Sequence, residues 1–310
     1  MRLAFVVDPL ETLKAYKDSS IAMMRAATAR GHEVHALEAR EMMVLEGAVR
    51  SRVRRLEIGG DDGAWYRIAA EAVKPLAEFD YVLMRKDPPF DQEYYYATLL
   101  LERAESEGTH VLNKPRALRD WNEKLAILRF PALCPPTLVA SDMAAIHAFV
   151  DNHRDVIVKK LDGMGGTMIF RVTAADPNRN VIVETLTDLG RRTIMAQRYI
   201  PEIAQGDKRV LVIDGEPFPQ CLARIPKAGE TRGNLAAGGT GIARPISARD
   251  REIAAAVGVE LVKAGIVFAG LDIIGDWLTE VNVTSPTCIV EIAEQTGLNA
   301  ANDLMDALGA

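Results

Sequence analysis

The sequence predicts a chain of mixed α/β and α+β class, in which a mostly parallel sheet comes first and antiparallel sheets follow. Two observations support this. In the first third, short apolar runs alternate with stretches of helical length and period, which is typical of a parallel sheet covered by helices. After residue 121, apolar runs are joined by tight turns such as Asp214-Gly215 and Gly275-Asp276, which are typical of β-hairpins. A chain of 310 residues with 48% apolar content suffices for two or three packed units.

The first third carries the parallel-sheet pattern. Strands are expected at 2–7, 33–38, 80–85 and 109–112, and helices near 19–30, 92–107 and 116–129. Ser19 or Asp18 can cap the first helix and Gly31 can end it. The polar, Gly-rich stretch 47–63 is expected to be a hairpin or an excursion outside the core.

The remaining two thirds alternate short strands with four helices. A helix near 142–152, a strand at 156–159, a second strand at 167–172 and a helix at 178–190 form a small α+β unit, and strands follow at 193–199, 208–213 and 217–224. Segment 227–243 has no clear period and is expected to be a lid or a disordered linker. A helix at 248–264, a hairpin and a C-terminal helix from about 288 complete the chain. We therefore expect domains at 1–120, 121–190 and 191–310.

Composition excludes several classes of protein. A net charge of −6 without a basic run argues against nucleic-acid binding. No apolar stretch approaches the roughly 20 residues of a membrane span, and the N-terminal apolar run is expected to be a buried strand rather than a signal peptide. The three cysteines, Cys134, Cys221 and Cys288, lack metal-like spacing. Buried thiols in a reducing cytoplasm are the simplest interpretation.

The last predicted hairpin carries a candidate metal site. Glu280 and Asn282 lie two residues apart on one strand, so they share a face, and a carboxylate with an amide oxygen suits Mg²⁺ carried by a nucleotide phosphate. Asp272 would complete the set only if it paired with Glu280. A simple two-residue turn would place it opposite Thr279, whereas a three-residue loop or a bulge would place it opposite Glu280.

A Gly-rich loop at 162–167 follows a strand that ends in lysines. Its glycines would let backbone amides approach phosphate oxygens, although the loop matches neither the Walker pattern nor a Rossmann fingerprint. A flexible strand–turn–strand is the alternative, and Lys159 favours the phosphate interpretation as a nearby cation. Lys124, on a predicted helix, has a solvated lysine as its alternative.

Further candidate ligand contacts lie at the ends of predicted strands. Backbone groups beyond Gln197–Ile200 could read an adenine edge, Asp207 could accept from ribose hydroxyls, and Arg209 and Arg224 could face phosphate. Arg232 is a cation in the 227–243 segment, and Arg85 follows a strand end, where α/β sheets bind ligands. The hydroxyls of Ser285 and Thr287 could hold a carboxylate, with helix capping by Thr287 as the alternative.

These motifs together resemble bacterial glutathione synthetase, an ATP-grasp ligase, nearly end to end. The Gly-rich loop and the metal strand are shared across ATP-grasp enzymes, and two other stretches are more specific to this synthetase: Arg85-Lys86-Asp87-Pro88-Pro89-Phe90 and Glu230-Thr231-Arg232-Gly233-Asn234-Leu235. Arg198 and Thr240 differ from the residues more usual in the family, Asn and Arg.

The resemblance implies an ATP-grasp fold with an N-terminal α/β (pre-ATP-grasp) domain, a small lid subdomain and a C-terminal antiparallel-sheet domain. It implies two Mg²⁺ (or Mn²⁺) ions held by Asp272, Glu280 and Asn282. It also implies that ATP is contacted by Lys124, Lys159, Asp162, Gly163, Met164, Gly165, Gly166, Thr167, Gln197, Tyr199, Ile200 and Asp207. It implies substrate contacts from Ser19, Arg85, Arg232, Asn234, Ser285, Pro286 and Thr287, and a homotetramer or a dimer.

The implied reaction joins γ-glutamylcysteine to glycine. ATP would phosphorylate the cysteinyl carboxylate, and glycine would displace phosphate from the acyl phosphate, with Arg209 and Arg224 as the catalytic residues. Two alternatives remain: an ATP-grasp ligase for another acid and amine, and a nucleotide-binding regulator without turnover. Intact candidate metal ligands argue against the regulator, and ADP formation that depends on the amine would distinguish it from an enzyme.

Overall fold

The chain folds into three sheets. The computed structural model describes residues 1–235 and 238–309. Its strands are β1 (Arg2–Val6), β2 (Glu33–Leu37), β3 (Met42–Leu45), β4 (Ala48–Ile58), β5 (Tyr66–Pro75), β6 (Tyr81–Met84), β7 (His110–Leu112), β8 (Thr137–Ala140), β9 (Asp155–Lys160), β10 (Ile169–Thr173), β11 (Ile194–Arg198), β12 (Asp207–Ile213), β13 (Glu216–Ile225), β14 (Thr240–Pro245), β15 (Phe268–Ile274) and β16 (Trp277–Asn282). Its α-helices are α1 (Ser19–Ala29), α2 (Gln92–Ser106), α3 (Pro115–Asp120), α4 (Met143–His153), α5 (Arg179–Thr187), α6 (Ala248–Ala264), α7 (Ile289–Thr296) and α8 (Ala300–Ala307).

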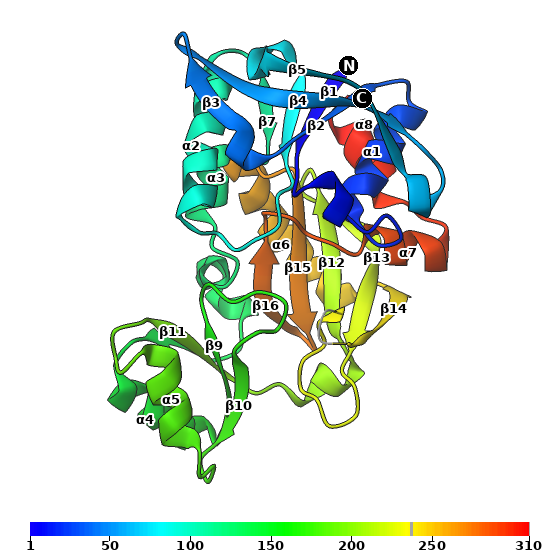
Figure 1. Ribbon diagram of the computed structural model, residues 1–310. Helices are drawn as coiled ribbons and strands as arrows, with labels where there is room; N and C mark the ends of the chain where they lie inside the picture. Colours follow the sequence, from blue (N-terminus) through cyan, green and yellow to red (C-terminus); the bar gives the residue numbers. More distant parts are fainter. Residues whose placement is uncertain (236–237, 310) are drawn as a thin grey trace.

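The N-terminal sheet has the order β3-β4-β2-β1-β6-β7, with β5 added on β4 (Figure 1). Strands β2, β1, β6 and β7 are parallel, as the alternating pattern predicts. Along β1, Ala4 and Val6 pack into the core that contains α2, whereas Leu3 and Phe5 pack into the core that contains α1. Burial on both faces explains why β1 is a continuous apolar run.

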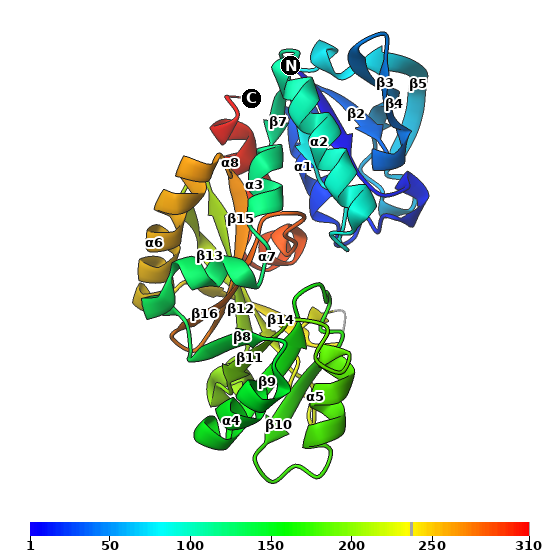
Figure 2. The same ribbon diagram turned by 90° about the vertical axis from the view of Figure 1, so that its left-hand side faces the viewer.

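The central and C-terminal sheets are antiparallel. The order of the central one is β10-β9-β11-β8 and of the C-terminal one β14-β13-β12-β15-β16. Figure 2 shows the central sheet, with α4 and α5, at the opposite end of the molecule from the N-terminal sheet. Val210 and Val212 of β12 pack with α6, and Leu211 and Ile213 pack on the other face, with α7 and α8.

Two predicted helices differ in the structure. The helix expected over 116–129 stops at Asp120, because Asn122 Oδ1 accepts hydrogen bonds from Lys124 N (3.1 Å) and Leu125 N (3.0 Å) and opens the backbone. A 3₁₀ turn, Leu125–Arg129, follows. The helix expected from about 288 is two helices, because Gly297 adopts a left-handed φ of 75° between α7 and α8.

The stretch 47–63 is a hairpin strand, as one of the two expectations had it, but it is not outside the core. Strand β4 pairs antiparallel with β2, and its Val49 and Val53 are buried. The arginines between these valines lie on the outer face of the strand, so the stretch has a polar composition although its other face is buried.

The described part of segment 227–243 is irregular up to β14, and residues 236 and 237 lie outside the described residues. Within 1–235 and 238–309, no helix has the length and apolar content to cross a bilayer. Because β11 pairs with β9 and β8, we propose that the central unit runs to about residue 198 rather than ending at 190.

Candidate functional site

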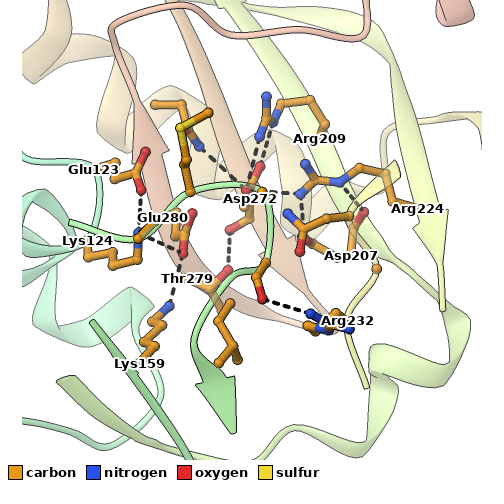
Figure 3. Close-up of a pocket in the computed structure, with 18 of the residues that line it drawn as sticks. Glu123, Lys124, Lys159, Asp207, Arg209, Arg224, Arg232, Asp272, Thr279 and Glu280 are labelled. Carbon is orange, nitrogen blue, oxygen red and sulfur yellow. Dashed lines mark hydrogen bonds and ion pairs between the residues drawn. The ribbon is translucent and has the colours of Figure 1, made fainter. Parts of the chain in front are cut away.

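A cavity of about 280 Å³ lies where the C-terminal sheet meets the central sheet (Figure 3). Most predicted site residues line it: Lys124, Lys159, Gly163, Met164, Gly165, Gly166, Gln197, Tyr199, Ile200, Asp207, Arg209, Arg224, Arg232, Asn234, Asp272, Glu280, Asn282, Ser285 and Thr287. Segments far apart in the chain therefore converge on one space.

Strand register builds a row of charges on the cavity face of the C-terminal sheet. Asp207 of β12 pairs with Arg224 of β13, and Arg209 of β12 pairs with Asp272 of β15. Asp272 in turn pairs with Glu280 of β16. Since side chains alternate along a strand, these five side chains share one face.

A bulge puts Asp272 opposite Glu280. The hairpin turn is Gly275-Asp276 alone, so that Ile274 pairs with Trp277 and Ile273 with Leu278. The register then shifts by one residue at Thr279, whose hydroxyl donates to the carbonyl of Asp272 at 3.0 Å. Of the two arrangements that the sequence allowed for a complete site, the bulge is the one that occurs.

Asp272 lies between two arginines. Arg209 donates to it through Nε–Oδ1 (2.5 Å) and Nη2–Oδ2 (3.1 Å), and Arg224 Nη2 is 2.9 Å from Oδ2. Burial opposes ionisation of Asp272, but Arg209 and Arg224 outweigh it and hold the pKa of its carboxyl well below the usual range. The site therefore contains a carboxylate whose ionised form is favoured and neutralised by two guanidinium groups.

Asp207 completes the arginine side of the cavity. Its Oδ2 accepts from Arg224, whereas its Oδ1 is buried without a partner among the described residues. Burial raises the pKa of Asp207 to about 6, despite the opposing effect of Arg224. A buried acceptor without a partner is costly unless a ligand satisfies it.

Glu280 lies among lysines on the other side. Lys159 Nζ donates to its Oε1 at 3.2 Å, and Lys124 Nζ lies 3.8 Å from the same oxygen. Lys124 Nζ also donates to Glu123 (Figure 3) and to the carbonyl of Gly163 at 2.6 Å. Burial raises the pKa of Glu123, and Glu280 raises it further.

Two loops meet over the cavity. Arg232, from the segment before β14, donates through Nη1 to the carbonyl of Gly166 at 3.2 Å. Gly166 has a φ of +82°, and a Cβ there would lie 2.8 Å from Asn234 Oδ1. Only glycine suits this close approach of the two loops.

Part of the cavity lining is apolar. Ile157, Ile200, Ile203 and Ile274 line it together with Tyr199. The Arg171 guanidinium carbon lies 3.8 Å from the centroid of the Tyr199 ring. A flat, apolar wall next to free strand ends suits an aromatic base.

Several predicted residues do not line this cavity. Asp162 lines a second, smaller cavity and Thr167 lines neither. Ser19 is buried, and its hydroxyl accepts from Ile289 N at 3.3 Å. Arg85 is buried as well and donates through Nη2 to the carbonyl of Pro286 at 2.9 Å. Arg85 thus anchors the segment that carries Ser285 and Thr287, which face the cavity, instead of facing it itself.

The sequence left two questions open here. The N-cap of α7 is Cys288 and not Thr287, which removes capping as an explanation for Thr287. Lys124, whose alternative was a solvated lysine, is only 2% exposed.

Sequence reasoning missed Glu123, Asp87, Thr279 and Cys288, which also line the cavity. The available signal was their position next to predicted site residues, since Glu123 precedes Lys124, Thr279 precedes Glu280 and Cys288 follows Thr287. All three cysteines are buried free thiols, as predicted.

The donor set fits a hard divalent cation. Asp272 and Glu280 are cross-strand neighbours, and Asn282 Nδ2 lies 3.5 Å from Asp272 Oδ2. No described cluster of three or more His, Cys, Asp and Glu side chains could hold a metal by itself. Two carboxylates and one amide oxygen suit Mg²⁺, which is usually bound by few protein ligands together with substrate phosphates.

Comparison with known sequences covers nearly the whole chain. Residues 1–119 match the N-terminal domain of prokaryotic glutathione synthetase, and residues 123–297 match its ATP-grasp domain. The chain is 53% identical over 310 residues to glutathione synthetase of Pseudomonas aeruginosa, covering 100% of this chain and 98% of that one. It is 56% identical over 306 residues to that of Bordetella pertussis, covering 96% of each.

Solved structures share the fold at much lower identity. D-cycloserine synthetase superposes with a TM-score of 0.68 at 17% identity, covering 99% of this chain and 100% of that one. The ATP-grasp ligase PsnB with a minimal precursor, Mg and ADP superposes with a TM-score of 0.64 at 21% identity, covering 99% and 96%. These similarities show an ATP-grasp fold.

Proposed function

This chain belongs to the prokaryotic glutathione synthetase family, and on that premise we propose how its cavity residues carry out the reaction. The chain is an ATP-dependent ligase that synthesises glutathione. The substrates we assign are γ-glutamylcysteine, glycine and ATP, with ADP and phosphate as the other products. The observation that carries the assignment of roles is the row of charges on β12, β15 and β16, which faces two lysines across the cavity.

The nucleotide occupies the space between the two antiparallel sheets. The adenine lies against the apolar wall near Gln197, Tyr199 and Ile200. Asp207 Oδ1 accepts a ribose hydroxyl, which supplies the partner that this buried oxygen lacks. Lys124 and Lys159 contact phosphates, and the backbone of the loop that includes Gly163 to Gly166 covers them.

Asp272, Glu280 and Asn282 hold the divalent cations in this proposal. The bound cations would neutralise charge on the phosphates and on the attacking carboxylate. Glu280, which accepts from Lys159 in this structure, would be one of the residues that hold a cation, and the Lys159 ammonium would then be available to a phosphate. In this structure the proposed metal ligand Glu280 and the proposed phosphate contact Lys159 are therefore paired with each other.

The arginines act at the reacting carbonyl. The cysteinyl carboxylate of γ-glutamylcysteine takes the γ-phosphoryl group, ADP leaves, and the glycine amine then displaces phosphate from the acyl phosphate. Arg209 stabilises the charge that builds up during phosphoryl transfer, and Arg224 stabilises the tetrahedral oxyanion that forms when glycine adds. Arg232 and Asn234 close the second loop over the substrates, while Ser285 and Thr287 bind a substrate carboxylate.

Omission kinetics test this proposal. The purified protein is incubated with MgATP, γ-glutamylcysteine and glycine, ADP is followed, and glutathione is detected by mass spectrometry. We expect turnover only when all components are present. ADP formation with another acid and amine, but not with this pair, would overturn the substrate assignment.

We also propose a homotetramer in the cytoplasm. Three buried free thiols are consistent with a reducing compartment. Size-exclusion chromatography with light scattering measures the molar mass of the assembly, and a mass of two chains would replace the tetramer proposal by a dimer.

A further inference from the structure

We propose that Glu123 is a positioning residue that holds Lys124 in the cavity and makes the site prefer metal-bound nucleotide to free nucleotide. The inference rests on the nucleotide and metal sites proposed above. Glu123 is not among the candidate residues that the sequence indicates, and it lies next to one of them in the chain.

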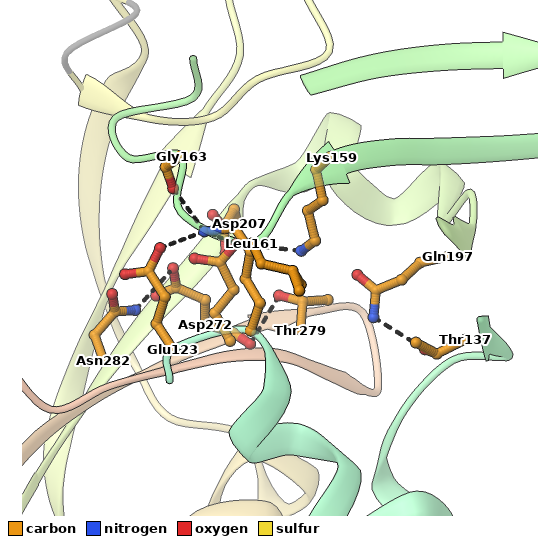
Figure 4. A network of polar contacts seen from close by, with 12 residues as sticks. Glu123, Thr137, Lys159, Leu161, Gly163, Gln197, Asp207, Asp272, Thr279 and Asn282 are labelled. Atoms are coloured by element: carbon orange, nitrogen blue, oxygen red, sulfur yellow. Dashed lines mark hydrogen bonds and ion pairs between the residues drawn. The ribbon is translucent and has the colours of Figure 1, made fainter. Parts of the chain in front are cut away.

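The backbone of Glu123 is fixed to the metal strand. Its carbonyl accepts a hydrogen bond from Val281 N at 2.8 Å. Val281 lies between Glu280 and Asn282 on β16 and is itself fully buried. The Glu123 carboxyl therefore enters the cavity from a point level with the proposed metal ligands (Figures 3 and 4).

The side chain of Glu123 is the close charged partner of Lys124. Lys124 Nζ donates to Glu123 Oε1, whereas it is 3.8 Å from Glu280 Oε1, beyond hydrogen-bond distance. The Lys124 side chain is 2% exposed and that of Glu123 is 22% exposed. An ammonium this deeply buried needs a counter-charge.

With a metal bound, Glu123 would be needed as the counter-charge of the Lys124 ammonium. A cation bound to Glu280 would compete with both lysines for its charge, so that Glu123 remains as the charged partner of Lys124. Lys124 also donates to the carbonyl of Gly163, which places the Gly-rich loop. Through Lys124, Glu123 keeps both the phosphate contact and the loop in place when the metal arrives.

The charge of the cavity explains the preference for bound metal. The described residues that line it include six basic side chains and five acidic ones. The acidic ones are Asp87, Glu123, Asp207, Asp272 and Glu280. Removing the charge of Glu123 raises the excess of basic over acidic lining side chains from one to two, which disfavours a divalent cation and favours a nucleotide anion without its metal.

The test is calorimetric binding of ADP, in Mg²⁺ and in EDTA, to the wild type, to Glu123→Gln and to Glu123→Asp. For Glu123→Gln we expect the Mg²⁺ concentration at half-saturation to rise roughly tenfold, equivalent to about 1.4 kcal/mol. Affinity for ADP in EDTA should rise severalfold. Glu123→Asp keeps the charge but shortens its reach to Lys124, so its Mg²⁺ half-saturation should rise as well, by less than that of Glu123→Gln. Glu252→Gln is the matched control, because it removes the same charge at an exposed pair with Arg249.

Opposite shifts in the two media are the distinguishing result, since a purely structural role would weaken both affinities together. Equal weakening, or no change, overturns the inference. If Glu123→Gln does not fold by circular dichroism, Glu123→Asp decides: an unchanged Mg²⁺ half-saturation there overturns the inference, and a raised one supports it. If the wild type itself binds no ADP, the proposed nucleotide site fails, which is a separate outcome.

Discussion

Replacing Arg209 by methionine tests the division of roles most directly. Arg209 is 6% exposed and makes two contacts to Asp272, which is 3% exposed. Breaking a buried ion pair costs about 3–5 kcal/mol when the remaining charge is left alone. Because Arg224 Nη2 stays 2.9 Å from Asp272, we expect a smaller loss of unfolding free energy, about 2 kcal/mol.

The kinetic effect should be larger than the effect on ATP binding. Loss of one hydrogen-bond donor at a site of developing charge typically lowers kcat about 10²–10³-fold. The KM for ATP should change by less than about threefold, because the lysines and the metal ligands remain. Steady-state kinetics and urea denaturation measure these quantities.

Two variants control for charge and size. Arg209→Lys keeps the charge but loses the two-point contact, so kcat should recover only in part. Arg249→Met removes a partly exposed pair with Glu252 and a hydrogen bond to the carbonyl of Asp276, and should cost about 1 kcal/mol. The reasoning is refuted if Arg209→Met keeps its kcat while KM for ATP rises, since Arg209 would then act in ground-state binding.

Three further predictions concern the metal, the loops and pH. Glu280→Gln should raise the Mg²⁺ concentration needed for half-maximal activity, about tenfold for one lost carboxylate, and a Mg²⁺ titration that matches the wild type would contradict this. Gly166→Ala should lower kcat without unfolding the protein, because the φ of +82° at this position and the 2.8 Å approach of a Cβ to Asn234 Oδ1 would strain only the loop. Steady-state kinetics and a thermal melt measure the two effects, and full activity would count against the close approach. Burial lowers the pKa of His35 below 6.5, so the unfolded state binds the proton first as pH falls, and unfolding free energy should decline below about pH 6.5. The reference pKa of a free histidine is about 6.5. Urea denaturation at pH values from 7.5 to 5 should show that the unfolding free energy of His35→Gln declines less with falling pH than that of the wild type. An equally steep decline in the variant would reject His35 as the cause.

Much of the charge row was predictable because strands have a period of two. Once Glu280 and Asn282 were assigned to one strand, their common face followed, and only the pairing of Asp272 depended on a bulge. The break at Asn122 was not predictable from periodicity, because the apolar spacing of a helix continues through 116–129 while a side-chain hydrogen bond opens the backbone.

Long-range contacts account for the other differences. The position of Arg85 at the end of β6 was foreseen, but its guanidinium turns to Pro286, which is distant in sequence. Glu123 reaches the cavity because its carbonyl bonds to Val281, again a distant partner. Local patterns place a Cα atom, whereas the direction of a long side chain depends on neighbours that only the folded chain supplies.

The bulge at Thr279 makes the active face of β16 depend on chain length as well as on composition. A regular ladder that grew from the same two-residue turn without the bulge would keep the hairpin, but it would pair Asp272 with Thr279 and leave Glu280 out of step. A variant that lost the bulge in this way could fold, remain monodisperse and resist protease while losing its reaction. Screens that score folding would therefore pass lesions in this hairpin that screens for growth would reject.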